Sequence, residues 1–310
     1  MDKYDWLASN SGPRGCPMRI LDGDFFFPGG SLYIPKASVH AGWGREVSLH
    51  VVGDDAKPLP DSAAVLFFSY LEDKLYRARF ALPRDSLARL FREGFPRPGP
   101  RGGRATYNAL VVGVAPGGAV AVWASGSERE VEVFFGQAEP ADVDWHRAMG
   151  MPPDVDRREL VTASLAEDAQ LDSLVRPMMA HVPTAERWAA YRTRYRWRPA
   201  FEGVGAPQRL ERVEFVNGER DALVLPLDAT QERAGLPAPR FFIFGDPRSG
   251  ARYRPSFDED EITAAFARVG AGGRPVELVF AAPTPGTSDP HVLVRSAADT
   301  VPLRKVTYVR

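Results

Sequence analysis

The 310-residue sequence contains a single cysteine, Cys16. One cysteine excludes an intramolecular disulfide and a zinc site built from several thiolates. The sequence also lacks any apolar run of about 18 residues, which excludes a membrane-spanning helix. Its start, MDKYDWLASN, has no basic segment followed by an apolar core, so the sequence as written predicts no secretory signal. We therefore expect a cytoplasmic protein, or a periplasmic one if a leader has been removed.

An excess of charge of one sign is missing as well. The 39 lysines and arginines nearly balance the 40 aspartates and glutamates, and the formal net charge is -1. Proteins that read nucleic acids usually carry a basic stripe with interleaved aromatic residues. The nearest approach to such a stripe, RYRWRPAF at residues 194–201, is short. We expect neither a nucleic acid nor an anionic membrane surface as a partner.

Signatures of metal binding and catalysis are also absent. No two of the five histidines stand at the spacing of metal ligands, and no serine stands in a Gly-x-Ser-x-Gly elbow; the histidines are His40, His50, His146, His181 and His291. The acidic run SFDEDEI lacks the spacing of a calcium loop, and its acids suit the first turn of a helix. We expect no metal, no cofactor and no enzymatic activity.

The most conspicuous segment that is present is GVAPGGAVAVWASG, residues 113–126. A phosphate-binding loop needs glycines that open a helix, whereas AVAVW after the glycines is β-branched and alternating, as in a strand. A Pro-Gly pair suits the two central positions of a type II turn. The segment therefore predicts a turn between two antiparallel strands.

Periodicity along the chain predicts an α+β protein. Strand patterns dominate residues 1–141, interrupted by PRDSLARLFREG, a short amphipathic helix with Asp85 as a plausible N-cap and Gly94 as a C-terminal stop. Residues 142–195 have helical spacing divided by prolines, and residues 196–310 are again rich in strands. We predict two antiparallel-sheet units, each with one short helix, joined by a helical connector.

The last third of the chain repeats the order of the first. Tyr76 and Phe80 match Tyr253 and Phe257 at one constant separation. Further matches pair two short motifs, three helix positions and the last strands: Leu59-Pro60 with Leu236-Pro237, Ala115-Pro116 with Ala282-Pro283, Asp85, Leu87 and Phe91 with Asp260, Ile262 and Phe266, and EVEVFF with LRKVTYV. The series predicts an internal duplication.

A series of motifs from Tyr4 to Trp145, thinner beyond, resembles a known bacterial family: YDW, CPMRILDGDFFFPGGSLYIP, HAGWG, FFSYLEDKLYRARFALP and VVGVAPGGAVAVWASG. The family has no characterised function, and many members are lipoproteins encoded beside lipase-class effectors of type VI secretion. Cys16 follows no apolar run, so this chain departs from the lipoprotein pattern. The resemblance implies an immunity protein that binds a cognate effector, expected to be a phospholipase, and blocks its active site.

Exposed loops are the expected contact points with such a partner. They are the hairpin tip with Glu72, Asp73 and Lys74, the loop with Arg97, Arg101 and Arg104, and the turn at Pro285. Two other functions remain open. Carboxylates brought together by the fold would make the protein a hydrolase of an envelope polymer, and an exposed tryptophan face would make it a glycan-binding module of the envelope.

Overall fold

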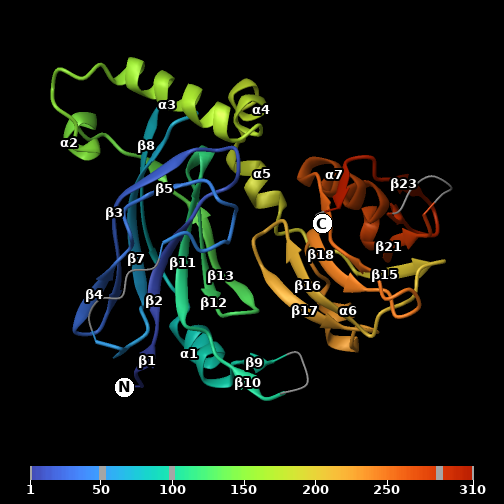
Figure 1. Cartoon of the computed structure of the whole chain (residues 1–310). Helices are drawn as coiled ribbons and strands as arrows, with labels where there is room; N and C mark the ends of the chain where they lie inside the picture. Colours follow the sequence, from blue (N-terminus) through green and yellow to red (C-terminus); the bar gives the residue numbers. More distant parts are fainter. Residues whose placement is uncertain (1, 49–53, 98–101, 284–288, 309–310) are drawn as a thin grey trace. The chain divides into compact units, whose positions relative to one another are not determined.

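The computed structural model describes residues 2–48, 54–97, 102–283 and 289–308 (Figure 1). The described residues up to Trp188 form one compact unit, unit 1, and those from Ala189 onward form a second, unit 2. Both units combine a few short helices with sheets that are mostly antiparallel, so the predicted α+β class is confirmed. The boundaries expected after residues 141 and 195 stay predictions.

Unit 1 is built on two sheets. Sheet A has the strand order β14-β8-β7-β3-β4, with β5 beside β3, and all of its pairs are antiparallel. Its strands are β3 (Met18–Phe27), β4 (Gly30–Tyr33), β5 (Ser38–Val39), β7 (Ser62–Ser69), β8 (Lys74–Ala81) and β14 (Glu139–Pro140).

Sheet B of unit 1 has the order β2-β11-β12-β13, in which β2 runs parallel to β11. Its strands are β2 (Leu7–Ser11), β11 (Ala109–Ala115), β12 (Ala119–Ser125) and β13 (Glu130–Gln137). Two further pairs are antiparallel two-stranded ladders: β1 (Tyr4–Asp5) with β6 (Ala56–Lys57), and β9 (Phe95–Pro96) with β10 (Arg104–Ala105).

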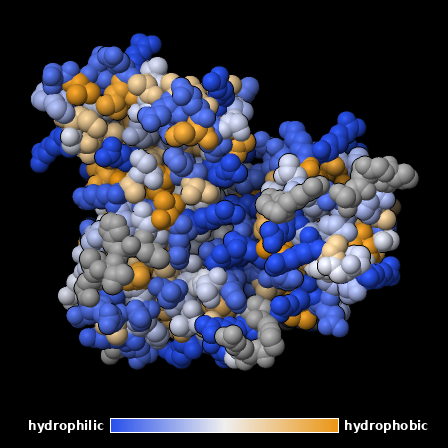
Figure 2. All heavy atoms as spheres, in the orientation of Figure 1, coloured by the Kyte–Doolittle hydropathy of each residue, from blue (hydrophilic) through white to orange (hydrophobic). Residues whose placement is uncertain are grey.

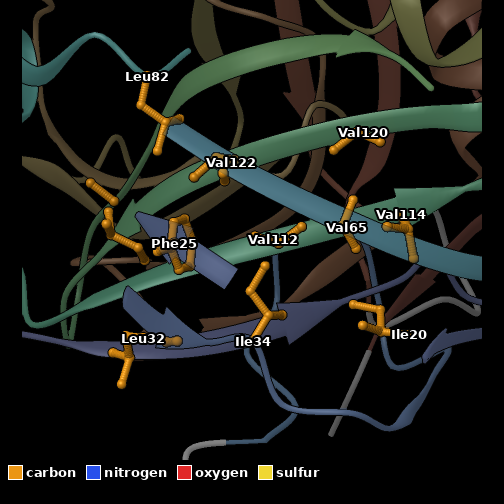
Figure 3. Packing of buried hydrophobic residues seen from close by; sticks show 14 of the residues in the cluster. Ile20, Phe25, Leu32, Ile34, Val65, Leu82, Val112, Val114, Val120 and Val122 are labelled. Atoms are coloured by element: carbon orange, nitrogen blue, oxygen red, sulfur yellow. The ribbon is translucent and has the colours of Figure 1, made fainter. Parts of the chain in front are cut away.

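The core of unit 1 lies between the inner faces of sheets A and B (Figure 3). Alternation explains which side chains enter it, because successive residues of a strand point to opposite faces. Phe25 and Val65 of sheet A meet Val112 and Val122 of sheet B there, and all four are buried. Helix α1 (Arg84–Glu93) adds buried apolar side chains to the same core. It begins at Arg84, so Asp85 lies in its first turn rather than at the N-cap, while Gly94 ends it as predicted.

The turn predicted in the glycine run joins β11 to β12. Pro116–Gly118 forms the short 3-10 turn η1, and Ala115 pairs with Ala119 on either side of it. Gly117 has φ 73° and ψ 8°, which is the left-handed conformation that the third residue of a type II turn needs. A side chain at Gly117 would also meet the backbone of Ala185 at 2.5 Å, so glycine is required twice.

Helices cover one end of the outer face of sheet A (Figure 1). Phe68 of β7 and Leu21 of β3 pack there against Trp145 and Leu165 in a second apolar cluster. The helices of this part of unit 1 are α2 (Trp145–Met149), α3 (Arg157–Leu171) and α4 (Val175–Ala180), followed by α5 (Ala185–Ala190) at the end of the unit. Asp144 and Asp156 cap the N-termini of α2 and α3 with their carboxylates.

Three tryptophans cover the outer face of sheet B. The Trp43 ring lies edge-on to Trp123 of β12 at 5.0 Å and beside Trp188 of α5 at 5.6 Å, measured between centroids. The Trp188 indole N–H donates a 2.8 Å hydrogen bond to the carbonyl oxygen of Pro116. Gly113 of β11 lies beneath this tryptophan cover, where an added Cβ would come within 2.5 Å of the Trp123 ring.

Unit 2 also contains two sheets. Sheet C has the order β24-β20-β18-β16-β17, with β19 beside β18, and sheet D has the order β15-β21-β22-β23. Among the described strands of unit 2, only β15 and β21 pair in parallel. The strands are β15 (Trp197–Glu202), β16 (Arg209–Phe215), β17 (Arg220–Val224), β18 (Pro239–Gly245), β19 (Arg252–Tyr253), β20 (Pro255–Phe257), β21 (Val276–Ala281), β22 (His291–Arg295), β23 (Thr300–Pro302) and β24 (Val306–Tyr308).

Aromatic rings fill the core of unit 2. Phe242 of sheet C lies edge-on to Trp197 and Phe280 of sheet D, at 6.0 and 5.6 Å between centroids. Helix α7 (Glu259–Val269) contributes Phe266, which contacts Trp197. Asp258 caps α7 and three acids lie in its first turn, as the acidic run predicted. A further short helix, α6 (Ala229–Ala234), was not predicted.

Candidate interaction surface

The tip of the β7–β8 hairpin is tied into unit 1 through Glu72. Its carboxylate accepts hydrogen bonds from the Tyr76 hydroxyl at 2.7 Å and from the Gly117 backbone N–H at 3.0 Å. Burial, together with the hydrogen bond to Glu72, raises the pKa of the Tyr76 hydroxyl above its ordinary value. The carboxylate of Glu72 therefore links the hairpin tip to the η1 turn.

The next residue, Asp73, is also engaged inside the unit. It has φ 48°, and its carboxylate accepts a 2.7 Å hydrogen bond from the Arg157 guanidinium of α3. Arg157 in turn lies over the rings of Phe68 and Trp145, at 5.7 and 5.8 Å from their centroids. Lys74 is exposed. A role of this tip in partner contact stays a prediction.

The predicted arginine loop follows α1. The Arg104 guanidinium donates hydrogen bonds to the carbonyl oxygens of Glu93 and Gly94, which satisfies acceptors at the C-terminus of α1. Arg97 is exposed, and its backbone N–H donates to Gly103. Arg101 and the turn at Pro285 lie outside the described residues. The hairpin tip lies at the start of β8, whereas α1 and the arginine loop come after the other end of β8. The structure therefore does not bring the two predicted groups together.

A different set of charged residues does come together, on the part of the outer face of sheet A beyond the helices. We call it the bipolar sheet face; its side chains are all exposed or half-buried and come from three adjacent strands: Asp22 and Asp24 of β3, Ala64 and Leu66 of β7, and Arg77 and Arg79 of β8.

The register of the three strands arranges the bipolar sheet face in two rows. Asp22 pairs with Leu66, which pairs with Arg77. The next row is formed in the same way by Asp24, Ala64 and Arg79. A β-bulge at Leu21 sets this alignment, because it shifts the register of β3 between Ile20 and Asp22. Acids thus line one side of β7 and arginines line the other.

The charges of the bipolar sheet face are only partly neutralised from within. Asp22 forms a 2.9 Å ion pair with Lys36, and both side chains are more than half exposed, at 65% and 60%. The Asp24 carboxylate accepts a 3.2 Å hydrogen bond from the Ser31 hydroxyl. Arg79 lies 5.2 Å from the centroid of the Phe26 ring. Arg77 is exposed and lies opposite Glu139 of β14 in the register, without forming an ion pair within the part of the chain that the structure describes.

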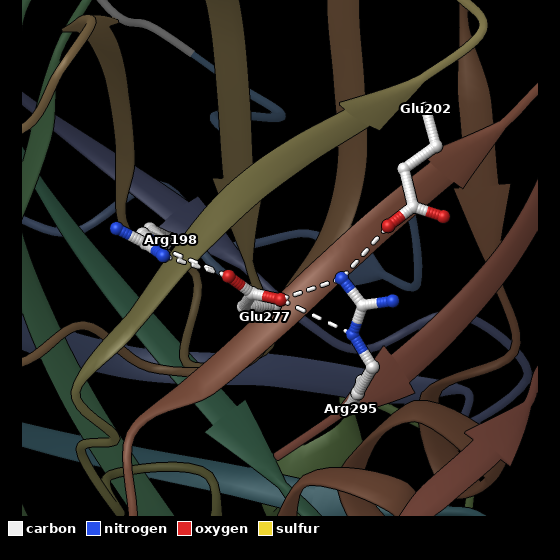
Figure 4. A network of polar contacts seen from close by, with 4 residues as sticks. All are labelled: Arg198, Glu202, Glu277 and Arg295. Carbon is white, nitrogen blue, oxygen red and sulfur yellow. Dashed lines mark hydrogen bonds and ion pairs between the residues drawn. The ribbon is translucent and has the colours of Figure 1, made fainter. Parts of the chain in front are cut away.

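The outer face of sheet D in unit 2 is charged too, but its charges pair with one another (Figure 4). Glu277 accepts hydrogen bonds from Arg198 at 2.8 Å and from Arg295 at 2.7 Å, and Arg295 also donates to Glu202 at 2.8 Å. The hydrogen bonds from Arg198 and then Arg295 hold the pKa of Glu277 below its ordinary value. This network leaves less charge unpaired than the bipolar sheet face.

Apolar side chains also reach the surface around α3 and α4, among the charged residues of the helices (Figure 2). Leu171 is 81% exposed, Met179 45% and Leu174 37%. Arg14 and Asp172 form an ion pair beside them at 3.5 Å. The patch has no charge pattern that selects a partner, so the bipolar sheet face is the stronger candidate.

Two further observations concern the described residues as a whole. They contain no group of three or more histidine, cysteine or acidic side chains placed to hold a metal ion. None of their helices combines the length and the apolar composition that a membrane crossing requires.

Sequence reasoning missed the bipolar sheet face, although two signals for it exist. Both LDGDF and YRARF alternate charged with apolar or small residues, which is the pattern of a strand with one wet face. The sequence does not reveal that β7 lies between these two strands, which is what sets acids and arginines opposite each other.

Comparisons with known proteins place the chain at the level of a family. No curated protein and no solved structure matches it. One family model, described as a protein of unknown function (DUF2931), matches residues 1–171, more than half of the chain. The uncharacterised-function family predicted from the motif series is thereby confirmed. The chain belongs to the DUF2931 family.

Proposed function

We propose that this protein is a non-enzymatic immunity protein that binds a cognate type VI secretion effector of the lipase class, a phospholipase, and blocks its active site. The motif series from Tyr4 to Trp145 motivates the effector class. The observation that carries a binding role is the bipolar sheet face, which lies within the family-matched residues and presents exposed acids and arginines on opposite sides of β7.

The arrangement suits rapid and selective binding of a protein. Opposite charges on a surface steer an approaching partner and fix its orientation, and juxtaposed like charges reject other partners. The strands that carry these side chains are held by a buried core on their inner face, so the surface is formed before the partner arrives. Little ordering entropy is then lost on binding.

The test uses the product of the adjacent gene, which the proposal expects to be a lipase-class effector. Calorimetric titration is expected to show a complex with one copy of each protein, and the complex is expected to lose lipase activity. Cells that express the effector are expected to survive when this protein is co-expressed. Absence of binding together with absence of rescue would end the proposal.

We also propose that units 1 and 2 are copies of one ancestral α+β unit. The strand order supports this, because the four neighbouring pairs of sheet A recur in sheet C and the three neighbouring pairs of sheet B recur in sheet D. In both units the first strand of the second sheet runs parallel to a strand that comes later than the helix: β2 pairs with β11, after α1, and β15 pairs with β21, after α7.

Side-chain contacts support the same proposal. Phe67 pairs with Tyr76 across β7 and β8, and Phe244 pairs with Tyr253 at positions 177 residues later. Each unit also begins with a Tyr-x-Trp motif whose tryptophan N–H donates to a proline carbonyl oxygen, Trp6 to Pro58 at 3.2 Å and Trp197 to Pro237 at 3.1 Å.

These contacts revise two details of the sequence alignment. Pro237 corresponds to Pro58, because Tyr4 pairs with Lys57 and Tyr195 with Leu236. The strand EVEVFF, which is part of β13, corresponds to β23, the last strand of sheet D. Strand β24 corresponds instead to β14, because β24 pairs with β20 as β14 pairs with β8. An experimental structure in which either unit has a different strand order would refute common ancestry.

A further inference from the structure

We propose that the bipolar sheet face binds a single amphipathic α-helix of a partner protein, with the helix axis along β7. The helix carries acidic side chains on one flank and basic side chains on the other, with a stripe of apolar side chains between them. The inference rests on the proposed function, since this helix is the element of the effector that the protein recognises.

The width of the face matches one helix. Neighbouring strands lie about 4.8 Å apart, so the acids of β3 and the arginines of β8 are separated by about 10 Å across β7. An α-helix with its side chains is about 10 Å in diameter. A helix lying on Ala64 and Leu66 therefore places one flank over the acids and the other over the arginines.

The spacing along the strands matches the pitch of a helix. Residues two apart in a strand, such as Arg77 and Arg79, are separated by about 6.6 Å. Residues four apart in a helix are separated by about 6 Å along its axis. Acidic side chains at positions i and i+4 of the partner helix thus meet both arginines, and basic ones at the same spacing on the other flank meet Asp22 and Asp24.

The length of the helix is bounded at one end. Phe68 and Leu21 are covered by α2 and α3, and the half-buried Leu66 packs against the edge of the same apolar cluster. The open stretch of β7 therefore runs from Ser62 no further than Leu66. Five strand residues span roughly 15 Å, which accommodates about ten helical residues, or three turns.

The charge pattern favours a helix with two different flanks over a uniformly charged one. A wholly acidic helix would meet Asp22 and Asp24, and a wholly basic one would meet Arg77 and Arg79, and each juxtaposition of like charges is unfavourable. Within the described residues, Lys36 competes for the acidic side through an exposed ion pair of the kind that contributes little free energy. On the basic side, Glu139 of β14 lies opposite Arg77 in the register without an ion pair to it in those residues.

A synthetic peptide tests the inference without the effector. The probe is a fluorescein-labelled helical peptide of three to four turns, with a leucine and alanine stripe, glutamates at i, i+4 on one flank and lysines at i, i+4 on the other. Fluorescence anisotropy is expected to show binding that weakens with salt. A peptide of the same composition with both charges mixed on each flank is expected to bind at least tenfold more weakly, about the change that misplaced charges produce.

Charge variants assign the binding to this face. The variant with Arg77→Glu and Arg79→Glu is expected to bind the probe at least about tenfold more weakly. Its matched control, Arg89→Glu with Arg158→Glu, changes the net charge equally on exposed positions of α1 and α3 and is expected to bind as wild type does.

A charge swap provides the rescue. The swapped variant exchanges the acids of β3 with the arginines of β8 and combines Asp22→Arg and Asp24→Arg with Arg77→Asp and Arg79→Asp. It is expected to restore binding because the helix then docks in the opposite direction. Circular dichroism verifies the fold of each variant. Equal binding of the mixed-flank peptide, no effect of the arginine variant, or an equal effect of its control overturns the inference. So does self-association of the wild type that the arginine variant abolishes, because the face would then bind a second copy.

The effector separates this inference from the proposed function. Effector binding that the arginine variant weakens supports both. Effector binding that no charge variant weakens overturns the inference and leaves the function standing. An effector that does not bind at all overturns the function, and the peptide titration then decides the inference.

Discussion

Sheets B and D have the same strand order, but different kinds of side chain cover their outer faces. In unit 1 the outer face of sheet B is covered by Trp43, Trp123 and Trp188. In unit 2 the corresponding face of sheet D carries a network in which Arg198 and Arg295 pair with Glu277. One sheet is closed by buried aromatic rings and the other by charges that neutralise one another.

The difference shows how one strand order accommodates two environments. Trp123 of the cover belongs to β12 itself, whereas Trp43 comes from the chain between β5 and β6 and Trp188 from helix α5. In unit 2 the connection between β17 and β18 is shorter than the connection between β4 and β7 in unit 1. The outer face of sheet D bears charged side chains instead of a tryptophan cover. Burial of large aromatic rings contributes several kcal/mol, whereas exposed ion pairs contribute about 0–1 kcal/mol. The two faces should therefore respond very differently to mutation.

Removing a ring from the tryptophan cover should have the largest effect. Trp123→Ala deletes a side chain that is 0% exposed, and we expect unit 1 to lose about 3–5 kcal/mol of unfolding free energy. Hydrogen exchange of β11 and β12 reports on unit 1 separately from unit 2. Arg295→Ala in sheet D should cost less than about 1 kcal/mol, measured on β21 and β22. Equal losses in the two units would contradict the comparison.

Adding a methyl group beneath the tryptophan cover should have the next largest effect. The Cβ of Gly113→Ala would lie 2.5 Å from the Trp123 ring, and the strain should cost about 1–3 kcal/mol. Gly245 of unit 2 is the matched control, because an added Cβ there meets nothing closer than 3.9 Å. Gly245→Ala should change stability by less than about 0.5 kcal/mol. Chemical denaturation followed by circular dichroism measures both; a tolerated Gly113→Ala would show that the cover is loosely packed.

The hairpin tip sharpens the comparison within unit 1. Glu72→Ala leaves the Gly117 N–H without its acceptor, which should cost about 1–3 kcal/mol in the same denaturation experiment. Lys74→Ala at the same exposed tip should change stability by less than about 0.5 kcal/mol. If both substitutions left stability unchanged while weakening effector binding, the tip would be a contact site rather than a structural tie.

Acid should weaken the charged network of sheet D by the smallest amount. Because hydrogen bonds from Arg198 and Arg295 lower the pKa of Glu277, its contribution is complete above the ordinary glutamate pKa of about 4.3. That contribution is lost as the pH falls through the lower pKa of the folded state. Wild type should exceed Glu277→Gln in stability by at most about 1 kcal/mol at pH 6, and the gap should shrink at pH 3.5. A gap that does not depend on pH would mean that the carboxylate charge is irrelevant there.

Local patterns in the sequence predicted local structure. The alternation in β8, the apolar spacing of α1 and the Pro116-Gly117 turn were all readable, because each depends on residues within one element. The predicted start of α1 was wrong, because the helix begins at Arg84, directly after Pro83, and not after Asp85. Such boundaries depend on a few weak backbone interactions and shift easily.

Long-range pairings were not readable. The parallel alignment of β2 with β11 joins residues about 100 positions apart. The contact between Glu72 and Gly117 likewise depends on how two distant turns meet, and the bipolar sheet face depends on β7 lying between β3 and β8. Each arises from the assembly of sheets, on which the periodicity of a single strand carries no information.

The parallel pairing of β2 with β11 has a consequence for synthesis on the ribosome. Leu7 emerges early, yet its partner Ala109 is translated about 100 residues later. At roughly 5–20 residues per second, β2 waits about 5–20 s for the strand it completes. The hairpins β3–β4 and β7–β8 are made from neighbouring segments and can form during this interval. The strands β3, β4, β7 and β8 of sheet A can therefore pair before β2 meets β11, although β2 is made first.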